Sequence, residues 1–409
     1  MPAPRKSGGR GERMDSIGIG IVGAGAIARR VLEHLVQPDV RGRVRLAAVC
    51  DPAPGRAEAA AAQYGIASWY TDYEALLRDP DVDMVTLCTP IGLHFSQGML
   101  AIEAGKHVHY NKTMAVTSAE AGELIAAAAR RGIKQAASPG NMLWPFNQRK
   151  RRYLLEGRLG RLVWAAGSSG DAAGYHLNET ERHALPDAMH NVSPAWYFSQ
   201  NGGGPLYDST VYALHSLTGV IGPARTVTAV TSRMREEFLF GGKPIPNEMD
   251  DFVMMLLGFD NGAYGLVASL PTEEPVSLGG QFGVFYGLDG FINENGLNGQ
   301  GRLKYEGDRM PHHFGGHGRM WECHVYEDVM QLADWVAGEG AEPICSTAHA
   351  RHVIEIIEGC YASAASGRTV PLETAFSPLG LDEIDEYLDR WGGNGPSVPV
   401  PRFGGDYTV

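Results

Sequence analysis

The first third of the chain alternates short apolar runs with amphipathic segments. Apolar runs bounded by Gly, Pro, Asn or Asp are typical of buried strands, and longer segments with apolar residues every three or four positions are typical of helices. Strands that alternate with helices form right-handed crossovers and a parallel sheet covered on both faces. We therefore predict an α/β fold that begins with a doubly wound Rossmann sheet. Its expected strands are 17–22, 44–50, 69–70, 83–88, 106–110 and 133–138, and its expected helices are 26–36, 56–64, 72–78, a segment ending at 105, and 118–131.

The first apolar run ends in Gly-Ala-Gly at 23–25, and a helical pattern follows at once. Gly23 allows a tight turn, and Gly25 lets the backbone approach a pyrophosphate that sits on the N–H groups of the helix start. A strand, a glycine turn and a helix in this order predict a dinucleotide site. Its expected residues are Gly23, Gly25, Ala26 and Ile27.

Several polar segments follow predicted strands and fall on the same edge of the sheet. In doubly wound sheets the ligand lies beyond the carboxyl ends of the strands, so we expect these residues to border the cofactor. Asp51 stands where an acid accepts hydrogen bonds from both ribose hydroxyls and repels a 2′-phosphate, which favours NAD over NADP; a helix cap is its alternative role. The other expected cofactor contacts are Thr89, Pro90, His94, Asn111, Lys112 and Asn141, with packing inside its loop as the alternative for His94.

Lys112 directly follows a buried strand at this edge, where a merely solvated lysine is not expected. A compact ammonium there can hydrogen-bond a substrate hydroxyl and stabilise an alkoxide as a hydride leaves. We therefore predict that Lys112 is catalytic.

The pattern changes after residue 141 and becomes rich in strands. A hairpin turn is expected at Asp260-Asn261-Gly262. This pattern is typical of an α+β domain with an open, mostly antiparallel sheet, whose exposed face a homo-oligomer, a dimer or tetramer, would cover. Expected elements are helices at 146–156, 206–221, 323–336 and 347–365, strands at 162–166, 225–235, 252–259, 264–270 and 280–287, and irregular chain at 167–204. The predicted division is a disordered extension at 1–14, an NAD-binding domain at 15–141, a substrate and oligomerisation domain at 142–390 and an extended tail at 391–409.

Three glycines at 202–204 precede the helix expected at 206–221. On that helix Asp208, Tyr212 and His215 stand at i, i+4 and i+7, which places a carboxylate, a phenol and an imidazole on one face. All three groups can move protons, so we predict that they are catalytic; a structural hydrogen-bond network is the alternative.

Two stretches of the second domain are rich in histidine. His176, His183 and His190 are evenly spaced, but no Cys or carboxylate completes a ligand pattern, and we expect no metal site. The polar loop 312–317 could bind a substrate or a metal by composition alone. The residues expected to line the substrate pocket are Trp144, His176 and Tyr212.

The amino-acid composition indicates which binding partners and which cellular compartment to expect. A hydrophobic content of 44% and a charged content of 20% are those of a globular protein, and the net charge of −12 disfavours nucleic acid and anionic membranes as partners. Five cysteines without a Cys-x-x-Cys pair fit reduced thiols in the cytoplasm. No apolar run is long enough to span a bilayer, and the basic first residues lack the apolar core of a secretory signal.

Together the motifs resemble the glucose-fructose oxidoreductase / inositol dehydrogenase / MocA (Gfo/Idh/MocA) family over about residues 16–369. The marks of the resemblance are Gly-Ala-Gly-Ala-Ile-Ala at 23–28, Asp51, Thr-Pro-Ile-Gly-Leu-His at 89–94, Ala-Gly-Lys-His-Val at 104–108 with Lys112, and Gly-Gly-Gly-Pro-Leu-Tyr-Asp at 202–208. Two departures stand out. The family's usual Glu-Lys-Pro is Asn111-Lys112-Thr113 here, and its Asp-x-Gly-x-His becomes Asp208 to Tyr212. A tyrosine at that place resembles the glucose-fructose oxidoreductase and dihydrodiol dehydrogenase branches, where it is taken as the acid/base.

The resemblance implies an NAD-dependent enzyme that moves a hydride between the nicotinamide and a carbinol carbon of a sugar, sugar derivative or cyclitol. Tyr212 would pass the proton, Lys112 would lower its pKa and hold the oxygen, and Asp208 would orient the substrate or Lys112. A phenol, with an ordinary pKa of about 10, needs such help near neutrality. His215 would stand in as base or polarise Tyr212. Two further classes remain open, a redox-neutral NAD-dependent glycoside-cleaving enzyme and a non-catalytic ligand-sensing protein.

Overall fold

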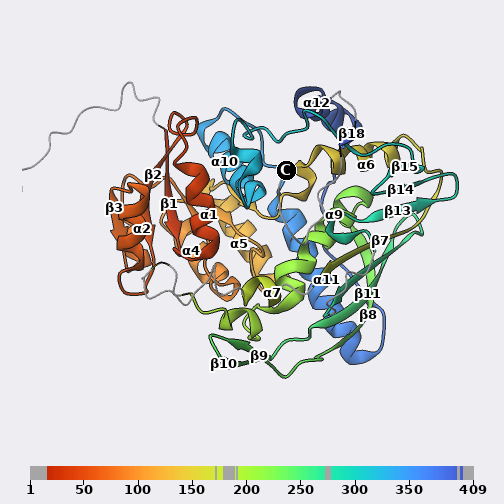
Figure 1. Cartoon of the computed structure of the whole chain (residues 1–409), viewed down its shortest axis with the longest axis horizontal. Coiled ribbons are helices and arrows are strands. Elements are labelled where there is room, and N and C mark those ends of the chain that lie inside the picture. The colour runs from red at the N-terminus through yellow and green to blue at the C-terminus, as the bar shows by residue number, and fades with distance from the viewer. Residues whose placement is uncertain are drawn as a thin grey trace, which may run out of the picture.

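The computed structural model of the chain describes residues 16–170, 173–177, 189, 192–271, 278–393 and 397–398. The predicted extension at 1–14, His183, His190 and most of the predicted tail lie outside the described residues. Figure 1 shows two sheets with helices against them, the first in red and orange and the second mainly in green. In the described part of the chain, no helix is both long enough and apolar enough to cross a membrane.

The first sheet has six parallel strands in the order β3-β2-β1-β4-β5-β6. Its strands are β1 (Ile17–Val22), β2 (Val44–Cys50), β3 (Ser68–Tyr70), β4 (Met84–Leu87), β5 (His107–Tyr110) and β6 (Gln135–Ala137). Its helices are α1 (Ala26–Leu35), α2 (Arg56–Tyr64), α3 (Tyr73–Leu77), α4 (His94–Glu103) and α5 (Ser118–Arg131). The predicted doubly wound sheet is confirmed. Continuous apolar strands form it because helices exclude water from both faces.

Local signals account for the ends of its helices. At the start of α5, the Thr117 side chain accepts from the Glu120 N–H while the Glu120 carboxylate accepts from the Thr117 N–H, which is a capping box. Gly132 ends the same helix with φ of 66°, a left-handed conformation that glycine adopts without steric cost.

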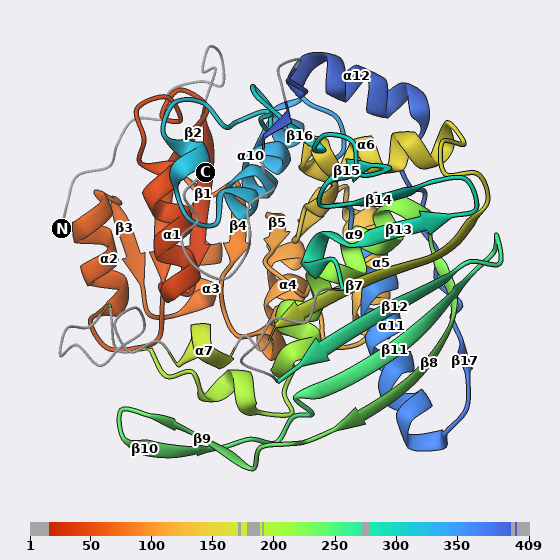
Figure 2. The ribbon, with the colours of Figure 1, turned by 45° about the vertical axis from the view of Figure 1, so that its right-hand side comes forward.

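The second sheet has eight strands in the order β15-β14-β13-β7-β12-β11-β8-β17. Only the pair β7 and β12 is parallel, so the expected open and mostly antiparallel sheet is confirmed. Figure 2 shows these strands as one curved layer with α11 behind them. The strands are β7 (Leu162–Gly170), β8 (Ala224–Ser232), β11 (Phe252–Phe259), β12 (Tyr264–Leu270), β13 (Val284–Gly287), β14 (Phe291–Asn293), β15 (Gly296–Leu297) and β17 (Val370–Pro371).

Two smaller two-stranded sheets complete the strands, β9 (Glu237–Phe240) with β10 (Lys243–Pro246) and β16 (Lys304–Tyr305) with β18 (Ser397–Val398). Single turns are η1 (Ile91–Leu93), η2 (Asn141–Leu143), η3 (Ala195–Phe198), η5 (Gly280–Phe282) and η6 (His317–Arg319), and η4 (Leu206–Thr210) is a π-helical turn. The remaining helices are α6 (Pro145–Leu155), α7 (Ala173–His176), α9 (Val211–Ile221), α10 (Cys323–Ala337), α11 (Thr347–Ser366) and α12 (Leu381–Trp391).

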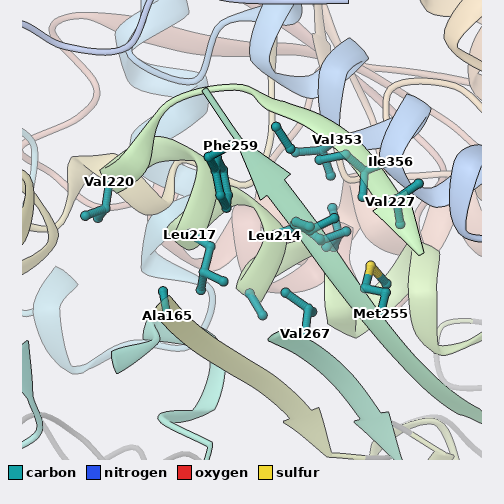
Figure 3. Packing of buried hydrophobic residues seen from close by; sticks show 14 of the residues in the cluster. Ala165, Leu214, Leu217, Val220, Val227, Met255, Phe259, Val267, Val353 and Ile356 are labelled. Atoms are coloured by element: carbon teal, nitrogen blue, oxygen red, sulfur yellow. The ribbon is translucent and has the colours of Figure 1, made fainter. Parts of the chain in front are cut away.

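One apolar core lies between the second sheet and the helices α9 and α11. Figure 3 shows Leu214 and Leu217 of α9 against Met255 and Val267 of the sheet, with Val353 of α11 closing the other side. Each of these side chains is at most 1% exposed. Their burial is the main force that fixes α9, and with it the residues of the candidate site, on the sheet.

The chain returns to the first sheet near its end. Val325, Val329 and Leu332 of α10 pack in the same cluster as Ile19 of β1 and Ala28 of α1. Figure 1 shows α10, in blue, close to the red helix α1. Residues well beyond position 141 therefore complete the core of the first sheet and place the start of α10 beside the strand ends.

Candidate active site

The glycine turn between β1 and α1 has the shape of a phosphate cradle. Gly23 has φ of 84°, and a Cβ there would lie 2.9 Å from the carbonyl oxygen of Cys88, so only glycine fits without strain. Among the described residues, the nearest atom to a Cβ added at Gly25 would be Val192 Cγ1 at 3.9 Å. Gly25 precedes α1 without a side-chain cap, so among the described residues the first N–H groups of the helix have room for a ligand. A pyrophosphate fits this arrangement.

Asp51 joins the glycine turn to the loop after β2. Its Oδ2 accepts from the Ala24 N–H at 2.9 Å, and its Oδ1 accepts from the Ala53 N–H at 2.8 Å. The Arg56 guanidinium lies 3.3 Å from the same carboxylate. The carboxylate therefore fixes the two loops at the end of the crevice where an adenosine ribose would lie.

Two other predicted cofactor contacts, His94 and Asn141, bond to buried protein groups. His94 is fully buried, with Nδ1 2.7 Å from Thr113 O and Nε2 3.0 Å from Thr89 O. It ties the loop after β4 to the loop after β5. Asn141 is 2% exposed, and its Nδ2 donates to Tyr212 O at 2.8 Å and to Ser216 Oγ at 2.9 Å. Each side chain satisfies buried backbone or hydroxyl groups, and for His94 this favours the alternative role of packing inside its loop.

The remaining strand-end residues stay near the crevice. Thr89 donates from Oγ1 to Gln97 Oε1, and Pro90 is exposed. Asn111 turns back on its own chain, where Oδ1 accepts from the Lys112 N–H at 2.8 Å. The peptide bond between Lys112 and Thr113 is cis.

Lys112 is held by a carboxylate from the other domain. Its Nζ lies 2.7 Å from Asp208 Oδ1, and the second oxygen of Asp208 lies 2.8 Å from His176 Nε2. Burial alone would raise the pKa of Asp208, but Lys112 and His176 hold that pKa well below its usual range. The predicted residues 112, 176 and 208 are thus brought together, with the ammonium aimed by a permanent negative charge.

Tyr212 lies beside this pair and adds a partner that the sequence did not indicate. Lys112 Nζ is 5.2 Å from the centre of the Tyr212 ring, and the Tyr212 hydroxyl is 3.1 Å from His324 Nε2. His324 stands in the first turn of α10, which explains why no local motif revealed it. Burial, then Lys112 and His313, lower the pKa of His324 to about 3, so its imidazole is neutral at physiological pH.

His215 does not join this group, which corrects the predicted single stripe. It is 3% exposed, its ring centre is 4.4 Å from that of His349 on α11, and burial followed by His352 lowers its pKa to about 3. On a regular α-helix Tyr212 and His215 stand only about 60° apart, so their separation comes from packing, which turns His215 toward His349 of α11. Asp208 stands in the π-turn η4 rather than in regular α-helix, which also breaks the assumed spacing.

The loop that contains 312–317 is fixed to both α1 and α10 by its histidines. His312 contacts Glu327 and Asp334 at 2.9 Å each, and His317 contacts His34 at 2.8 Å. His313 places its ring edge against Trp144, 6.3 Å between centres. Among the described residues, no group of three or more His, Cys, Asp or Glu side chains could hold a metal ion.

An uncapped helix start beside a glycine turn, and a lysine after β5 of the same sheet that meets Asp208 and Tyr212 from the chain on the second sheet, are features of a nicotinamide-dependent oxidoreductase. Two sequence profiles agree: "Oxidoreductase family, NAD-binding Rossmann fold" matches residues 17–137, and "GFO/IDH/MocA C-terminal domain" matches residues 147–270. The chain belongs to the Gfo/Idh/MocA oxidoreductase family.

Named relatives share parts of the chain. It is 29% identical over 208 residues to D-glucoside 3-dehydrogenase of Escherichia coli, a match that covers 50% of this chain and 54% of that protein. It is 25% identical over 276 residues to levoglucosan dehydrogenase of Pseudarthrobacter phenanthrenivorans, covering 62% of this chain and 67% of that protein. The chain therefore matches only about half the length of the first relative.

Solved structures match over more of the chain and establish its fold. An NAD binding oxidoreductase from Klebsiella pneumoniae has a TM-score of 0.67 at 24% identity, covering 88% of this chain and 99% of that one. Levoglucosan dehydrogenase in complex with NADH and L-sorbose has a TM-score of 0.67 at 20% identity, with the same coverage.

Proposed function

We propose that this protein is an NAD-dependent oxidoreductase that transfers a hydride to or from a carbinol carbon of a sugar, sugar derivative or cyclitol. The observation that carries the proposal is the Lys112–Asp208 pair. The Lys112 ammonium, 2.7 Å from the Asp208 carboxylate, is a charged donor at the carboxyl end of β5. β5 belongs to the sheet that carries the glycine turn.

The crevice suits NAD at both ends. The backbone N–H groups at the start of α1 would hold the pyrophosphate, and Asp51 would face the adenosine ribose and disfavour a 2′-phosphate. Thr89, Pro90 and Asn111 would border the nicotinamide end. When bound, the nicotinamide supplies the carbon that accepts or donates the hydride.

The protein's own groups would handle the oxygen and its proton. Lys112 would donate a hydrogen bond to the substrate oxygen and stabilise the negative charge that develops on it. Asp208 fixes the Lys112 ammonium and supplies the negative charge that balances it, and His176 holds the second oxygen of Asp208. Tyr212, in contact range of Lys112, would exchange the proton with the substrate oxygen.

Polyhydroxylated rings are the proposed substrates. The relatives are named for a D-glucoside and for levoglucosan, and a further one is a D-xylose dehydrogenase from Paenarthrobacter nicotinovorans. Trp144 offers an apolar ring for the C–H face of such a molecule, stacked on Phe146 with 5.7 Å between centres.

The second sheet supports a proposed homo-oligomer. Val230 and Met254 are paired across β8 and β11, and Trp164 and Tyr264 across β7 and β12; all four are at least 37% exposed. An apolar face of this extent is typical of a protein interface, and a second copy of the chain would cover it. We also propose a cytoplasmic location, which the unpaired cysteines fit.

The test is a panel of polyols, aldoses and glycosides offered to protein of known cofactor content. The expected result is NADH formation with one or a few polyols, lost in Lys112→Ala and kept in Lys106→Ala, whose ammonium lies at the opposite end of β5 on Asp79 O and Val82 O. Release of an aglycone without net NADH would instead indicate redox-neutral glycoside cleavage. Cofactor binding without any turnover would indicate a ligand-sensing protein.

A further inference from the structure

The Tyr212 hydroxyl lies between helices that pack on different sheets. Tyr212 belongs to α9 on the second sheet, whereas His324 belongs to α10, whose apolar residues pack under the first sheet. Their side chains meet at 3.1 Å, with ring centres 5.5 Å apart in an edge-on arrangement. This is a hydrogen-bond distance for an oxygen and an imidazole nitrogen. The pair therefore joins a helix of the second sheet to a helix of the first.

We propose that His324 is a positioning residue and proton relay for Tyr212. The inference rests on the proposed function, because it assigns a route to the proton that the substrate hydroxyl loses. Neither local sequence nor helix spacing points to His324, which stands 112 positions after Tyr212.

The groups around His324 determine the protonation state of its imidazole. Burial lowers its pKa most, and Lys112 and His313 lower it further, which keeps the resting imidazole neutral and able to accept a hydrogen bond. The carboxylate of Glu322 lies 3.6 Å from the same Nε2. Asp208 and Glu327 are the other carboxylates nearby, paired with Lys112 and with His312 respectively. A proton that arrives on Nε2 thus finds Glu322 to stabilise it.

Glu322 is itself held in an unusual conformation. Its φ of 56° lies in the left-handed region, which is uncommon for a residue other than glycine. Strained backbone of this kind collects at functional sites, where the surrounding structure over-determines it. Here it places the carboxylate directly before α10, beside the nitrogen that contacts Tyr212.

In the proposed relay, atoms, charges and electrons balance when an alcohol is oxidised. The substrate C–H bond breaks as the hydride leaves with its electron pair to NAD, and the C–O bond becomes a carbonyl. The substrate O–H proton passes to the Tyr212 oxygen while the Tyr212 proton passes to His324 Nε2. The alcohol is oxidised, NAD is reduced, and His324 ends as an imidazolium beside Glu322. Reduction runs through the same atoms in reverse.

The kinetic test uses His324→Gln, which keeps a polar side chain but cannot carry a proton, and His107→Gln as the matched control. His107 sits half-buried at the start of β5, where Nδ1 accepts from the Lys134 N–H at 2.9 Å. His324→Gln is expected to lower kcat by about 10²-fold with KM nearly unchanged. Added imidazole should restore part of kcat in His324→Ala and none in Tyr212→Phe. Full kcat in a folded His324→Gln protein would overturn the inference.

A second readout needs neither substrate nor cofactor. Nitrogen NMR of the cofactor-free protein is expected to show His324 neutral at pH 7, with the proton on Nδ1 and a shift of the Nε2 signal in Tyr212→Phe. An imidazolium, or an Nε2–H tautomer, would overturn the relay whatever the substrate is. If no polyol is oxidised while the NMR result holds, the proposed function fails and the Tyr212–His324 pair stands.

Discussion

The cofactor side and the chemistry side of the crevice are built in different ways. The glycine turn comes from a short stretch of chain, Ile17–Leu35, in which strand, turn and helix are contiguous. The opposite side gathers Lys112, His176, Asp208, Tyr212 and His324 from five separate elements or loops. The first is fixed by local backbone geometry, the second by the packing of α9 and α10 onto different sheets. Binding and catalysis should therefore respond to different substitutions.

The largest effect is expected from Lys112→Ala. Removing the donor to the substrate oxygen should lower kcat by about 10³-fold, the upper range for losing one charged or oxyanion-type donor. The dissociation constant for NAD should change little, because the glycine turn is untouched. Steady-state kinetics and cofactor titration on the same preparation measure both. Equal losses of binding and turnover would contradict the separation of the two sides.

The stability of the protein should depend on pH through His312, which contacts Glu327 and Asp334 of α10. Burial opposes its charge, but Asp334 and Glu327 raise its pKa to about 9. A raised pKa stabilises the fold below the ordinary value of 6.5, and this contribution is lost as pH rises from 6.5 through 9. The loss should be ~3 kcal/mol in the free energy of unfolding. Denaturant unfolding of wild type and His312→Gln at pH 6 and pH 9 tests this; equal pH dependence in the two proteins would refute it.

On the cofactor side, substitutions at two neighbouring glycines should affect NAD affinity and the stability of the fold separately. Gly25→Ala adds a methyl group to open space beside the turn, so the NAD dissociation constant should rise about tenfold, or ~1.4 kcal/mol, with unfolding unchanged. Gly23→Ala should destabilise the fold by ~2 kcal/mol, because φ is 84° and Cys88 O lies too close. Calorimetry of binding and thermal unfolding measure the two. If Gly25→Ala left the affinity for NAD unchanged, the cofactor would have to bind at another site.

The smallest effect is expected from Asp51→Asn. Loss of the negative charge should shift the ratio of NAD to NADP affinity by about fivefold toward NADP, or ~1 kcal/mol. Competitive titration with both cofactors measures the ratio. A ratio that stays constant would mean that the Asp51 carboxylate serves the Ala24 and Ala53 N–H groups and Arg56 rather than the cofactor.

The same contrast explains what the sequence could predict. The first sheet and the glycine turn follow from apolar runs and from the rule that strand ends share one edge, whereas a role for Asp208 beside Lys112 is what the family resemblance implies. The hairpin of β9 and β10 escaped prediction because it packs only through a few residues, such as Phe238 on Phe198, and carries prolines within β10.

The corrections have a common physical origin. His94, Asn141 and His215 stand at the right places in the chain, but each turns toward buried protein groups that are distant in sequence. His324 was missed for the converse reason, since its partner Tyr212 is brought to it only by the packing of α10 under the first sheet. The spacing of residues along the sequence predicts where the backbone of a residue lies but not the direction of its side chain.

The most direct measurement of the central claim follows the hydride itself. A polyol that turns over is prepared with deuterium on its carbinol carbons, and the nicotinamide product is examined by mass spectrometry. We expect one deuterium on the reduced nicotinamide for each carbonyl formed, and label transfer about 10³-fold slower with Lys112→Ala. Carbonyl or aglycone formation without deuterium on the nicotinamide would contradict it.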